Sequence, residues 1–389
     1  MTTHSTATRV CGVLTGALMF LVVAPASAAT LTVSNGASPC PGATYTTIQS
    51  AIDAATAHDE VTVCAGTYAE QILVAADKDG LVLRSSEPLA AILQAPATMA
   101  DPGDIVRINA AHDVTLEGFT IAGPLPNPLF CSLFPRAGVR VDGSGSAILR
   151  NDRITDIRSE DPALRGCQNG IAILVGSQAS GEIGSALIEH DTIEAYEKTG
   201  VLVENAGSRA VIVDNRVTGD GPSAQIAQNG IQVSFGADAF VGNNWVSGQI
   251  YSPSPLASAL LFYLPGHVTV VGNHVHDADF GIATVDATAP EIRDNEVAAC
   301  TSAGIDLDED TLGTTCALVV GNESHGNGMD GIYVSASSTN NDLRENRMFA
   351  DRELDARDDS TGGGTAGTAN RWHRDRCKTD NHGGLLCTR

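Results

Sequence analysis

The sequence predicts an all-β protein, a single-stranded parallel β-helix of about ten coils. Three observations support this fold: the composition, a phrase that recurs along the chain, and the kinds of residue in each repeat. Of the 389 residues, 40 are glycine and only 4% are aromatic. Such a composition is typical of a β architecture with many turns and not of a helical bundle.

A short phrase recurs through most of the chain: Asn or Asp, any residue, Ile or Val, a loop, and then Gly-apolar-x-apolar. Its second half begins every 22 to 32 residues, at Gly138, Gly170, Gly200, Gly230, Ala259, Gly281, Gly304 and Gly331. A period of this length with variable loops is typical of a solenoid. Each period contains short β-prone runs, such as Val211–Val213 and Ile231–Val233, and no helical spacing. Three short strands per coil, stacked on the coils above and below, make a parallel β-helix.

The first half of the phrase places a polar residue at each turn, at Asp152, Asp191, Asn215, Asn244, Asn273, Asn295, Asn322 and Asn346. We expect the Asn residues to adopt the left-handed backbone conformation that tight turns need. We also expect their side chains to pair with one another from coil to coil, as in amide ladders.

Both ends of the solenoid are expected to be covered. Apolar residues recur at helical spacing within 48–55, directly after Thr46-Thr47, and predict a short N-terminal capping helix. The β-helix itself is expected over residues 29–359. A Gly/Thr-rich linker over 360–369 and a tail over 370–389 that folds back as a cap would follow it.

Residues 1–28 have the pattern of a signal peptide, with Arg9, an apolar stretch over 10–26 and small residues up to Ala28. An uncleaved membrane anchor is disfavoured because the apolar run is short. We therefore expect a secreted or periplasmic monomer, cleaved near Ala28, with no membrane contact after cleavage. The formal net charge of −23 argues against nucleic acid and anionic lipid as partners.

Three N-terminal phrases carry a family resemblance: Tyr45–Ile52 (YTTIQSAI), Val61–Val63 (VTV) and Gly66–Glu70 (GTYAE). They resemble the start of the right-handed parallel β-helix proteins of the pectin-lyase-like superfamily, and the later Gly-Ile-x-Val phrases are similar to the repeats of that superfamily. The resemblance covers about residues 30–359 and implies a right-handed helix. It does not decide the activity, because the superfamily includes lyases, glycoside hydrolases, epimerases, esterases and non-catalytic surface proteins.

In that superfamily the Gly-Ile-x-Val strand lines the substrate groove, and the loop before the strand varies. The two longest such loops here are 122–137 and 155–169, on adjacent coils. Eight cysteines remain after signal removal, and in an oxidising compartment we expect them to staple loops and caps. The expected pairs are Cys40–Cys64, Cys131–Cys167, Cys300–Cys316 and Cys377–Cys387.

Alternation along each strand predicts which side chains face the groove. One outward stripe reads Arg140, Ala172, Leu202, Gln232, Leu261, Ala283, Asp306 and Tyr333; the next reads Asp142, Leu174, Glu204, Ser234, Tyr263, Val285, Asp308 and Ser335. We take Arg140, Glu204, Gln232, Tyr263 and Tyr333 as candidate binding residues, the two tyrosines because an exposed ring can stack on a sugar.

The first candidate catalytic zone is Asp306 and Asp308, which one strand face would hold roughly 6.5 Å apart. This separation falls between the retaining and inverting ranges of glycoside hydrolases. Crowded acids raise one another's pKa, which suits a general acid. Loop residues expected nearby are His274, His276, Asp277, Asp279, His325 and Asp330. The alternatives are Ca²⁺ held by Asp279, Asp306, Asp308 and Asp330, or a solvated acidic face.

The second zone places Lys198 and Arg165, with Arg140, Arg158 and Glu204, around the long loops. Lys or Arg there can grip a uronate carboxylate or act as a base, as in β-helix lyases. The alternative is a set of loop salt bridges with Asp156, Glu160, Asp161 and Glu197. The hydrolase triplet Asn-Thr-Asp with Asp-Asp and Gly-His-Gly is missing, and so is the Asp-Pro-His of epimerases.

The sequence therefore predicts an exported protein that binds an extracellular polysaccharide in the groove and, if it is an enzyme, cleaves it as a lyase or glycoside hydrolase. Two alternatives remain open. One is a non-catalytic, adhesin-like surface or matrix protein that binds glycans. The other is a periplasmic metal-handling β-helix, suggested by the His274-x-His276 pair.

Overall fold

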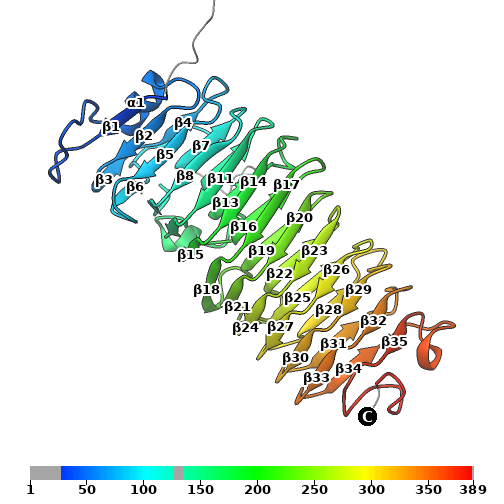
Figure 1. The fold of residues 1–389 in the computed structure, drawn as a ribbon. Coiled ribbons are helices and arrows are strands. Elements are labelled where there is room, and N and C mark those ends of the chain that lie inside the picture. Colours follow the sequence, from blue (N-terminus) through cyan, green and yellow to red (C-terminus); the bar gives the residue numbers. More distant parts are fainter. Residues whose placement is uncertain (1–27, 127–134, 388–389) are drawn as a thin grey trace, which may run out of the picture.

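The computed structural model describes residues 28–126 and 135–387 and shows a rod of stacked coils (Figure 1). Its strands form three long sheets of thirteen, eleven and eleven strands, here called sheets A, B and C. Each strand pairs in parallel with the equivalent strand of the coils before and after it, as β17 does with β14 and β20. The predicted all-β parallel β-helix is confirmed, with eleven coils in sheets B and C over the described residues.

Sheet A contains β1 (Thr30–Val33), β2 (Glu60–Val63), β5 (Val82–Ser85), β8 (Val114–Glu117), β11 (Ser146–Arg150), β14 (Ser185–Glu189), β17 (Arg209–Val213), β20 (Asp238–Gly242), β23 (Val268–Val271), β26 (Glu291–Arg293), β29 (Leu318–Val320), β32 (Asp342–Arg344) and β35 (Arg371–His373). Sheet B contains β3 (Gly66–Ala69), β6 (Ala91–Gln94), β9 (Thr120–Ala122), β12 (Arg153–Thr155), β15 (Thr192–Glu194), β18 (Arg216–Ser223), β21 (Trp245–Tyr251), β24 (His274–His276), β27 (Glu296–Ala298), β30 (Glu323–His325) and β33 (Arg347–Phe349).

Sheet C contains β4 (Ile72–Val74), β7 (Val106–Asn109), β10 (Ala137–Asp142), β13 (Ile171–Val175), β16 (Thr199–Glu204), β19 (Asn229–Ser234), β22 (Ser258–Tyr263), β25 (Phe280–Val285), β28 (Ile305–Asp308), β31 (Asp330–Val334) and β34 (Leu354–Asp358). The helical elements are α1 (Ile48–Ala54) and two short 3₁₀ turns, Pro162–Leu164 and Thr365–Gly367. No helix in the described residues is both long and apolar enough to cross a membrane.

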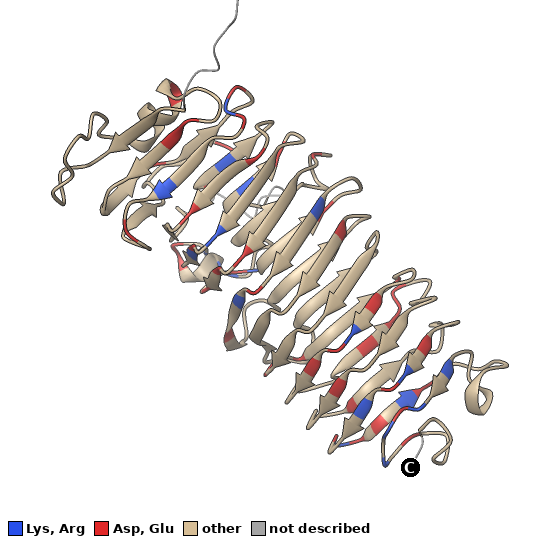
Figure 2. Cartoon of the chain, in the orientation of Figure 1, with Lys and Arg blue, Asp and Glu red and all other residues tan. Residues whose placement is uncertain are grey.

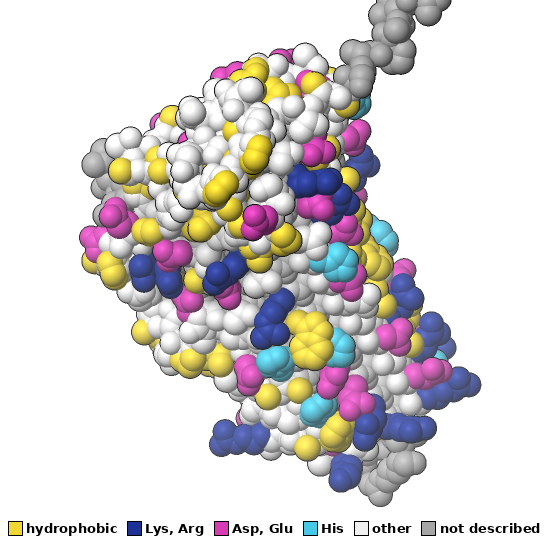
Figure 3. Space-filling view, turned by 60° about the vertical axis from the view of Figure 1, so that its left-hand side comes forward, with side chains coloured by type: hydrophobic (Ala, Val, Ile, Leu, Met, Phe, Trp, Pro, Cys, Tyr) yellow, Lys and Arg dark blue, Asp and Glu magenta, His cyan; other side chains and the backbone are white. Residues whose placement is uncertain are grey.

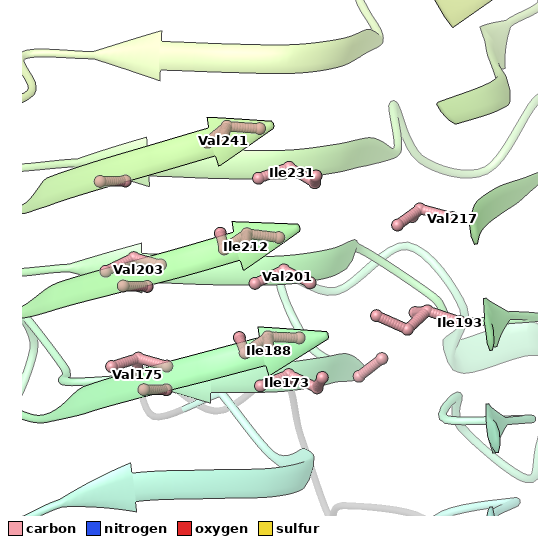
Figure 4. Packing of buried hydrophobic residues seen from close by; sticks show 14 of the residues in the cluster. Ile173, Val175, Ile188, Ile193, Val201, Val203, Ile212, Val217, Ile231 and Val241 are labelled. Atoms are coloured by element: carbon pink, nitrogen blue, oxygen red, sulfur yellow. The ribbon is translucent and has the colours of Figure 1, made fainter. Parts of the chain in front are cut away.

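The core is a set of aliphatic columns that run along the rod. Ile173, Val201 and Ile231 occupy equivalent positions on successive strands of sheet C and are fully buried. Figure 4 shows this column beside columns from the other two sheets, with all side chains pointing into the coil. Because every coil buries the same positions, an inward residue meets a like residue above and below, and β-branched side chains pack well in that setting.

The predicted amide ladder is confirmed at the turn between sheets A and B. Each Asn side-chain nitrogen donates to the Oδ1 of the next coil at 2.9–3.0 Å, through Asn215, Asn244, Asn273, Asn295, Asn322 and Asn346. The left-handed residue is the one before each ladder position, such as Asp214 and Asn243, and not the ladder Asn itself. That expectation was wrong because the ladder Asn points its side chain inward, and its neighbour makes the bend.

A helix covers the N-terminal end of the rod, and a further strand extends its C-terminal end. Helix α1 begins after Thr47, whose side chain accepts a hydrogen bond from the Ser50 N–H, and it buries Ile48, Ala51 and Ile52 on the first coils. At the other end β35 pairs with β32, so the regular coil extends past residue 359 into the segment expected to be a tail. The predicted signal peptide lies almost wholly in residues 1–27, outside the described residues.

The cysteine pairs are partly as expected. Cys40–Cys64 and Cys377–Cys387 form disulfides. Cys131 lies outside the described residues, so its pairing with Cys167 stays a prediction. The pair Cys300–Cys316 is wrong, because both thiols are free. Cys300 is buried just before β28, whereas Cys316 is exposed in the turn after that strand, so the strand separates them.

The ladder begins with two aspartates that replace asparagine. The Oδ1 of Asp152 accepts from the Phe119 N–H, and that of Asp191 accepts from the Asp152 N–H. The Oδ2 atoms take the place of the amide nitrogens, and in the described residues neither has a hydrogen-bond partner. Burial raises the pKa of Asp191 to about 8, and burial together with the Asp191 charge raises the pKa of Asp152 well above its usual range. The raised pKa values favour the protonated form of both side chains, and we interpret the Oδ2–H of a protonated carboxyl as the replacement for the amide donor.

We expect the free energy of unfolding to fall as the pH rises from about 4, the pKa of an unfolded Asp, to about 8, because the folded state keeps protons that the unfolded state has lost. The double variant Asp152→Asn, Asp191→Asn supplies permanent donors. In this variant the free energy of unfolding should lose most of its dependence on pH. At the alkaline end of the window it should exceed that of the native protein by about 1–3 kcal/mol, because that is the cost of an unsatisfied buried polar group. Urea unfolding across this pH range measures both. A slope unchanged from that of the native protein and of the exposed-site control Glu87→Gln would contradict the assignment.

Candidate functional site

The outer face of sheet C carries the stripe that the sequence predicts, with one correction. Gln232, Leu261, Ala283, Asp306 and Tyr333 lie in register on successive strands. In β13 the stripe position is held by Leu174 and not by Ala172. The reason is that Gly138 aligns with Ala172, because Gly170 lies two residues too early to begin the strand.

The first hollow on this face, called the acidic cleft, has a volume of about 470 Å³. It is lined by Pro255, Phe280, Ser302, Ala303, Asp306, Asp308, Met329, Asp330, Tyr333 and Arg357. Three carboxyl groups, from two adjacent strands, therefore share one small space with an arginine and a tyrosine. Acidic residues also recur from coil to coil through the C-terminal half of the rod (Figure 2).

Of the three carboxyl groups in the acidic cleft, Asp306 has the most strongly raised pKa. It lies at the middle of β28, is only 4% exposed, and its Oδ1 has no hydrogen-bond partner among the described residues. Burial, with the charges of Asp308 and Asp330 added, raises the pKa of Asp306 well above its usual range. Burial without a partner favours the protonated form of a carboxyl group, so we interpret Asp306 as a neutral acid at the wall of the cleft.

Asp330 and Arg357 complete the cleft on the next two coils. Burial raises the pKa of Asp330 to about 6, although the Arg357 guanidinium, with its nitrogen 4.0 Å from the Asp330 carboxylate, works against the rise. Arg357 also pairs with Asp359 at 3.0 Å and lies over the Tyr333 ring at 5.6 Å. Sequence reasoning missed Arg357 because β34 (LDARD) lacks the glycine that opens the other strands, although it follows Tyr333 in the stripe.

The second hollow, called the lysine groove, has a volume of about 620 Å³ and lies over β13 to β22 of the same sheet. It brings together four predicted residues: Lys198, Glu204, Gln232 and Tyr263. The Lys198 ammonium donates to the Ala227 carbonyl at 2.7 Å, and burial lowers its pKa to about 8. Burial raises the pKa of Glu204. The Tyr263 hydroxyl donates to Asp310 at 2.9 Å.

Three predicted cations lie outside both hollows. Arg140 is 3% exposed and forms an ion pair with Asp104 at 2.5 Å. Arg165 donates to the Ser159 carbonyl within its own loop. Arg158 likewise pairs with Asp156 and Asp220. The alternative interpretation as loop salt bridges is therefore right for Arg158, whereas the ligand role of Arg140 stays a prediction.

The residues considered as metal ligands do not all lie close to one another. Asp279 holds the 251–257 loop, because its Oδ2 accepts the backbone N–H groups of Tyr251, Leu256 and Ala257. His274, His276 and His325 lie on sheet B and not beside Asp306, so of the expected neighbours only Asp330 borders the acidic cleft. Across residues 28–126 and 135–387, the one group of three ligand atoms that converges is Cys377, Asp380 and Cys387, and its cysteines form a disulfide. Calcium in the acidic cleft stays a prediction.

The comparisons agree with this architecture. Residues 173–348 match the family model described as a right handed beta helix region. A mutant of the periplasmic alginate epimerase AlgG superposes with a TM-score of 0.50 and 11% identity over 78% of this chain and 65% of that one. The Dettilon tailspike protein gives a TM-score of 0.52 and 13% identity over 90% and 62%. No curated protein matches the chain.

These similarities establish the fold as a right-handed parallel β-helix, as the sequence predicted. The chain spans less than two thirds of the length of both solved proteins. At 11–13% identity the likeness carries no catalytic residue across. The function must therefore be argued from the two hollows themselves.

We expect Asp306 to stay protonated at neutral pH. The difference between the infrared spectra of the native protein and the Asp306→Asn variant at about pH 7 should contain the C=O stretch of a neutral carboxylic acid. The matched control is Glu291→Gln, on the half-exposed outer side of sheet A, which shows whether the same change from carboxyl to amide elsewhere on the rod produces that band. Carboxylate bands from Asp306 would contradict the assignment.

Proposed function

We propose that this protein binds an extracellular polysaccharide along the groove of sheet C and cleaves it as a glycoside hydrolase in the acidic cleft. Asp306 is the single observation that carries the proposal. It is a buried carboxyl group with a free oxygen in a cleft, next to two further carboxyl groups. A buried acid without a partner costs stability, and such groups cluster at functional sites.

The chemistry needs a proton donor and a carboxylate. A neutral Asp306 can protonate the glycosidic oxygen of a sugar held in the cleft. Asp308 lies two residues along the same strand, roughly 6.5 Å away, and is half-exposed, so it can act as the ionised partner. Although burial also raises the pKa of Asp308, its access to solvent favours ionisation over that of Asp306. Arg357 and Tyr333 then border the position of the sugar ring.

Polysaccharide as the ligand has two further supports. The lysine groove and the acidic cleft lie on the same outer face of sheet C, so a chain of several sugars can reach both hollows, which a single sugar cannot. One structural neighbour is named as an alginate epimerase, an enzyme of a polysaccharide. The disulfides Cys40–Cys64 and Cys377–Cys387 suit an oxidising compartment, and we extend the proposal to an exported protein.

A second candidate is a lyase that uses Lys198. Burial brings the pKa of Lys198 down to about 8, so near neutral pH a fraction of the amine is free to accept a proton. The Gln232 and Asn229 side chains, joined by a hydrogen bond of 2.8 Å, lie in the same groove and can orient a sugar there. This reaction would leave an unsaturated sugar at the new chain end, which hydrolysis does not.

The test incubates the purified full chain with alginate, polygalacturonate, hyaluronan, xylan and β-glucan and follows reducing ends together with the ultraviolet absorbance of unsaturated products. We expect reducing ends without that absorbance from at least one polymer. The Asp306→Asn, Asp308→Asn double variant should lose at least about a hundredfold in rate, the usual contribution of a positioned acid or base.

Glu291→Gln on sheet A is the matched control and should keep full activity. If reducing ends appear together with the absorbance of unsaturated products, the enzyme is a lyase and not a hydrolase. That activity should then be lost in Lys198→Ala and kept in the double variant. Polymer binding without any product, in a protein shown by circular dichroism to be folded, would contradict catalysis and leave a non-catalytic glycan-binding protein.

A further inference from the structure

A second feature with ligand-binding character lies on the outer face of sheet B. Trp245 opens β21 there with half of its surface (50%) exposed. In the sheet register it lies between Arg216 of the preceding coil and His274 of the following one. Figure 3 shows histidine, basic and large hydrophobic side chains gathered on this side of the rod. Exposing an indole ring to water forgoes the free energy of burying it.

The Trp245 ring is held in place from one side only. The His274 ring stacks on it with centroids 4.5 Å apart and planes 20° from parallel. His274 is fixed in turn by a contact of 3.0 Å between its Nδ1 and Glu296. Because the two rings belong to neighbouring coils, their faces look along the rod. The second indole face therefore looks toward the coil of Arg216.

A hollow of about 410 Å³ lies on that side of the ring. It is lined by His190, Asp191, Thr192, Asp214, Asn215, Arg216 and Trp245. Arg216 and Asp214 are exposed, and neither forms an ion pair within the part of the chain that the structure describes. Most other arginines on this sheet face do pair, such as Arg153 with Glu194 and Arg347 with Glu323. The hollow thus offers one aromatic face with a free donor group and a free acceptor group.

We propose that this hollow is a second glycan-binding site, in which the Trp245 ring packs against one pyranose of a polysaccharide while Arg216 donates hydrogen bonds to its hydroxyl oxygens and Asp214 accepts hydrogen bonds from its hydroxyl groups. A pyranose has an apolar C–H face and a polar rim, and the site presents the matching surfaces. A protein partner is a less suitable ligand, because the core of a protein interface is apolar and Trp245 has the charged neighbours Arg216 and Glu296. The site is separate from sheet C and does not depend on the groove being catalytic.

Trp245 reports on its own site by fluorescence. The chain has only two tryptophans, and the other, Trp372, is 4% exposed with its indole N–H bound to Asp358. Acrylamide quenching of the native protein therefore comes mainly from Trp245. The probes are hexasaccharides of guluronate, galacturonate, xylose and cellulose. We expect at least one probe to protect Trp245 from acrylamide by about twofold in a saturable titration. Trp245→Ala should weaken binding of that probe about tenfold by calorimetry, whereas Trp245→Phe should largely keep it.

The Asp306→Asn, Asp308→Asn double variant separates the two sites and should keep the protection of Trp245. Protection that disappears in this groove variant would assign the effect to sheet C and overturn the proposal. The proposal also fails if no probe protects Trp245, or if Trp245→Ala binds the protecting probe as tightly as the native protein. Because the readout is protection of Trp245 and not turnover, the site can be upheld even if the groove proves inactive.

Discussion

Parallel pairing between neighbouring coils is the constraint on which the rest of the structure depends. It fixes the coil-to-coil register, with strands roughly 4.8 Å apart, so that each position of the repeat becomes a column along the rod. Buried columns become the Ile173–Val201–Ile231 stack and the Asn ladder. The exposed column of sheet C becomes the floor of the groove. A slip of one residue would exchange the two faces of a strand, so the core and the groove are specified together.

The carboxyl groups of the rod divide by whether their oxygens are satisfied. Burial alone would raise the pKa of Asp286, but backbone N–H groups of the 310–313 loop hold it below its usual value. Asp279 is likewise occupied in fixing a loop. Asp306 has no such partners for its Oδ1 and faces a cleft. Asp306 combines an unpartnered oxygen with a place in a cleft beside two further carboxyl groups, which the ladder aspartates Asp152 and Asp191 lack, and this combination gives Asp306 its place in the proposed mechanism.

The sequence was sufficient to predict the fold, because equivalent positions of successive coils need the same kinds of residue and this produces a visible repeat. It also placed Gln232, Asp306 and Tyr333 on the correct stripe. It failed where a coil departs from the repeat, as at Leu174 and Arg357. The Cys300–Cys316 pairing failed for another reason, because sequence spacing does not show that a strand separates the two cysteines. Nor does the sequence show that Arg140 is buried in an ion pair with Asp104.

The central claim is that a polysaccharide chain lies along sheet C with one sugar over Asp306. The most direct measurement is a crystal structure of the Asp306→Asn, Asp308→Asn double variant with a hexasaccharide of a polymer that the native protein binds. The account predicts sugar density that runs from the lysine groove into the acidic cleft, with a ring bordered by Tyr333 and Arg357. A hexasaccharide that leaves sheet C empty and binds only elsewhere on the rod would contradict it.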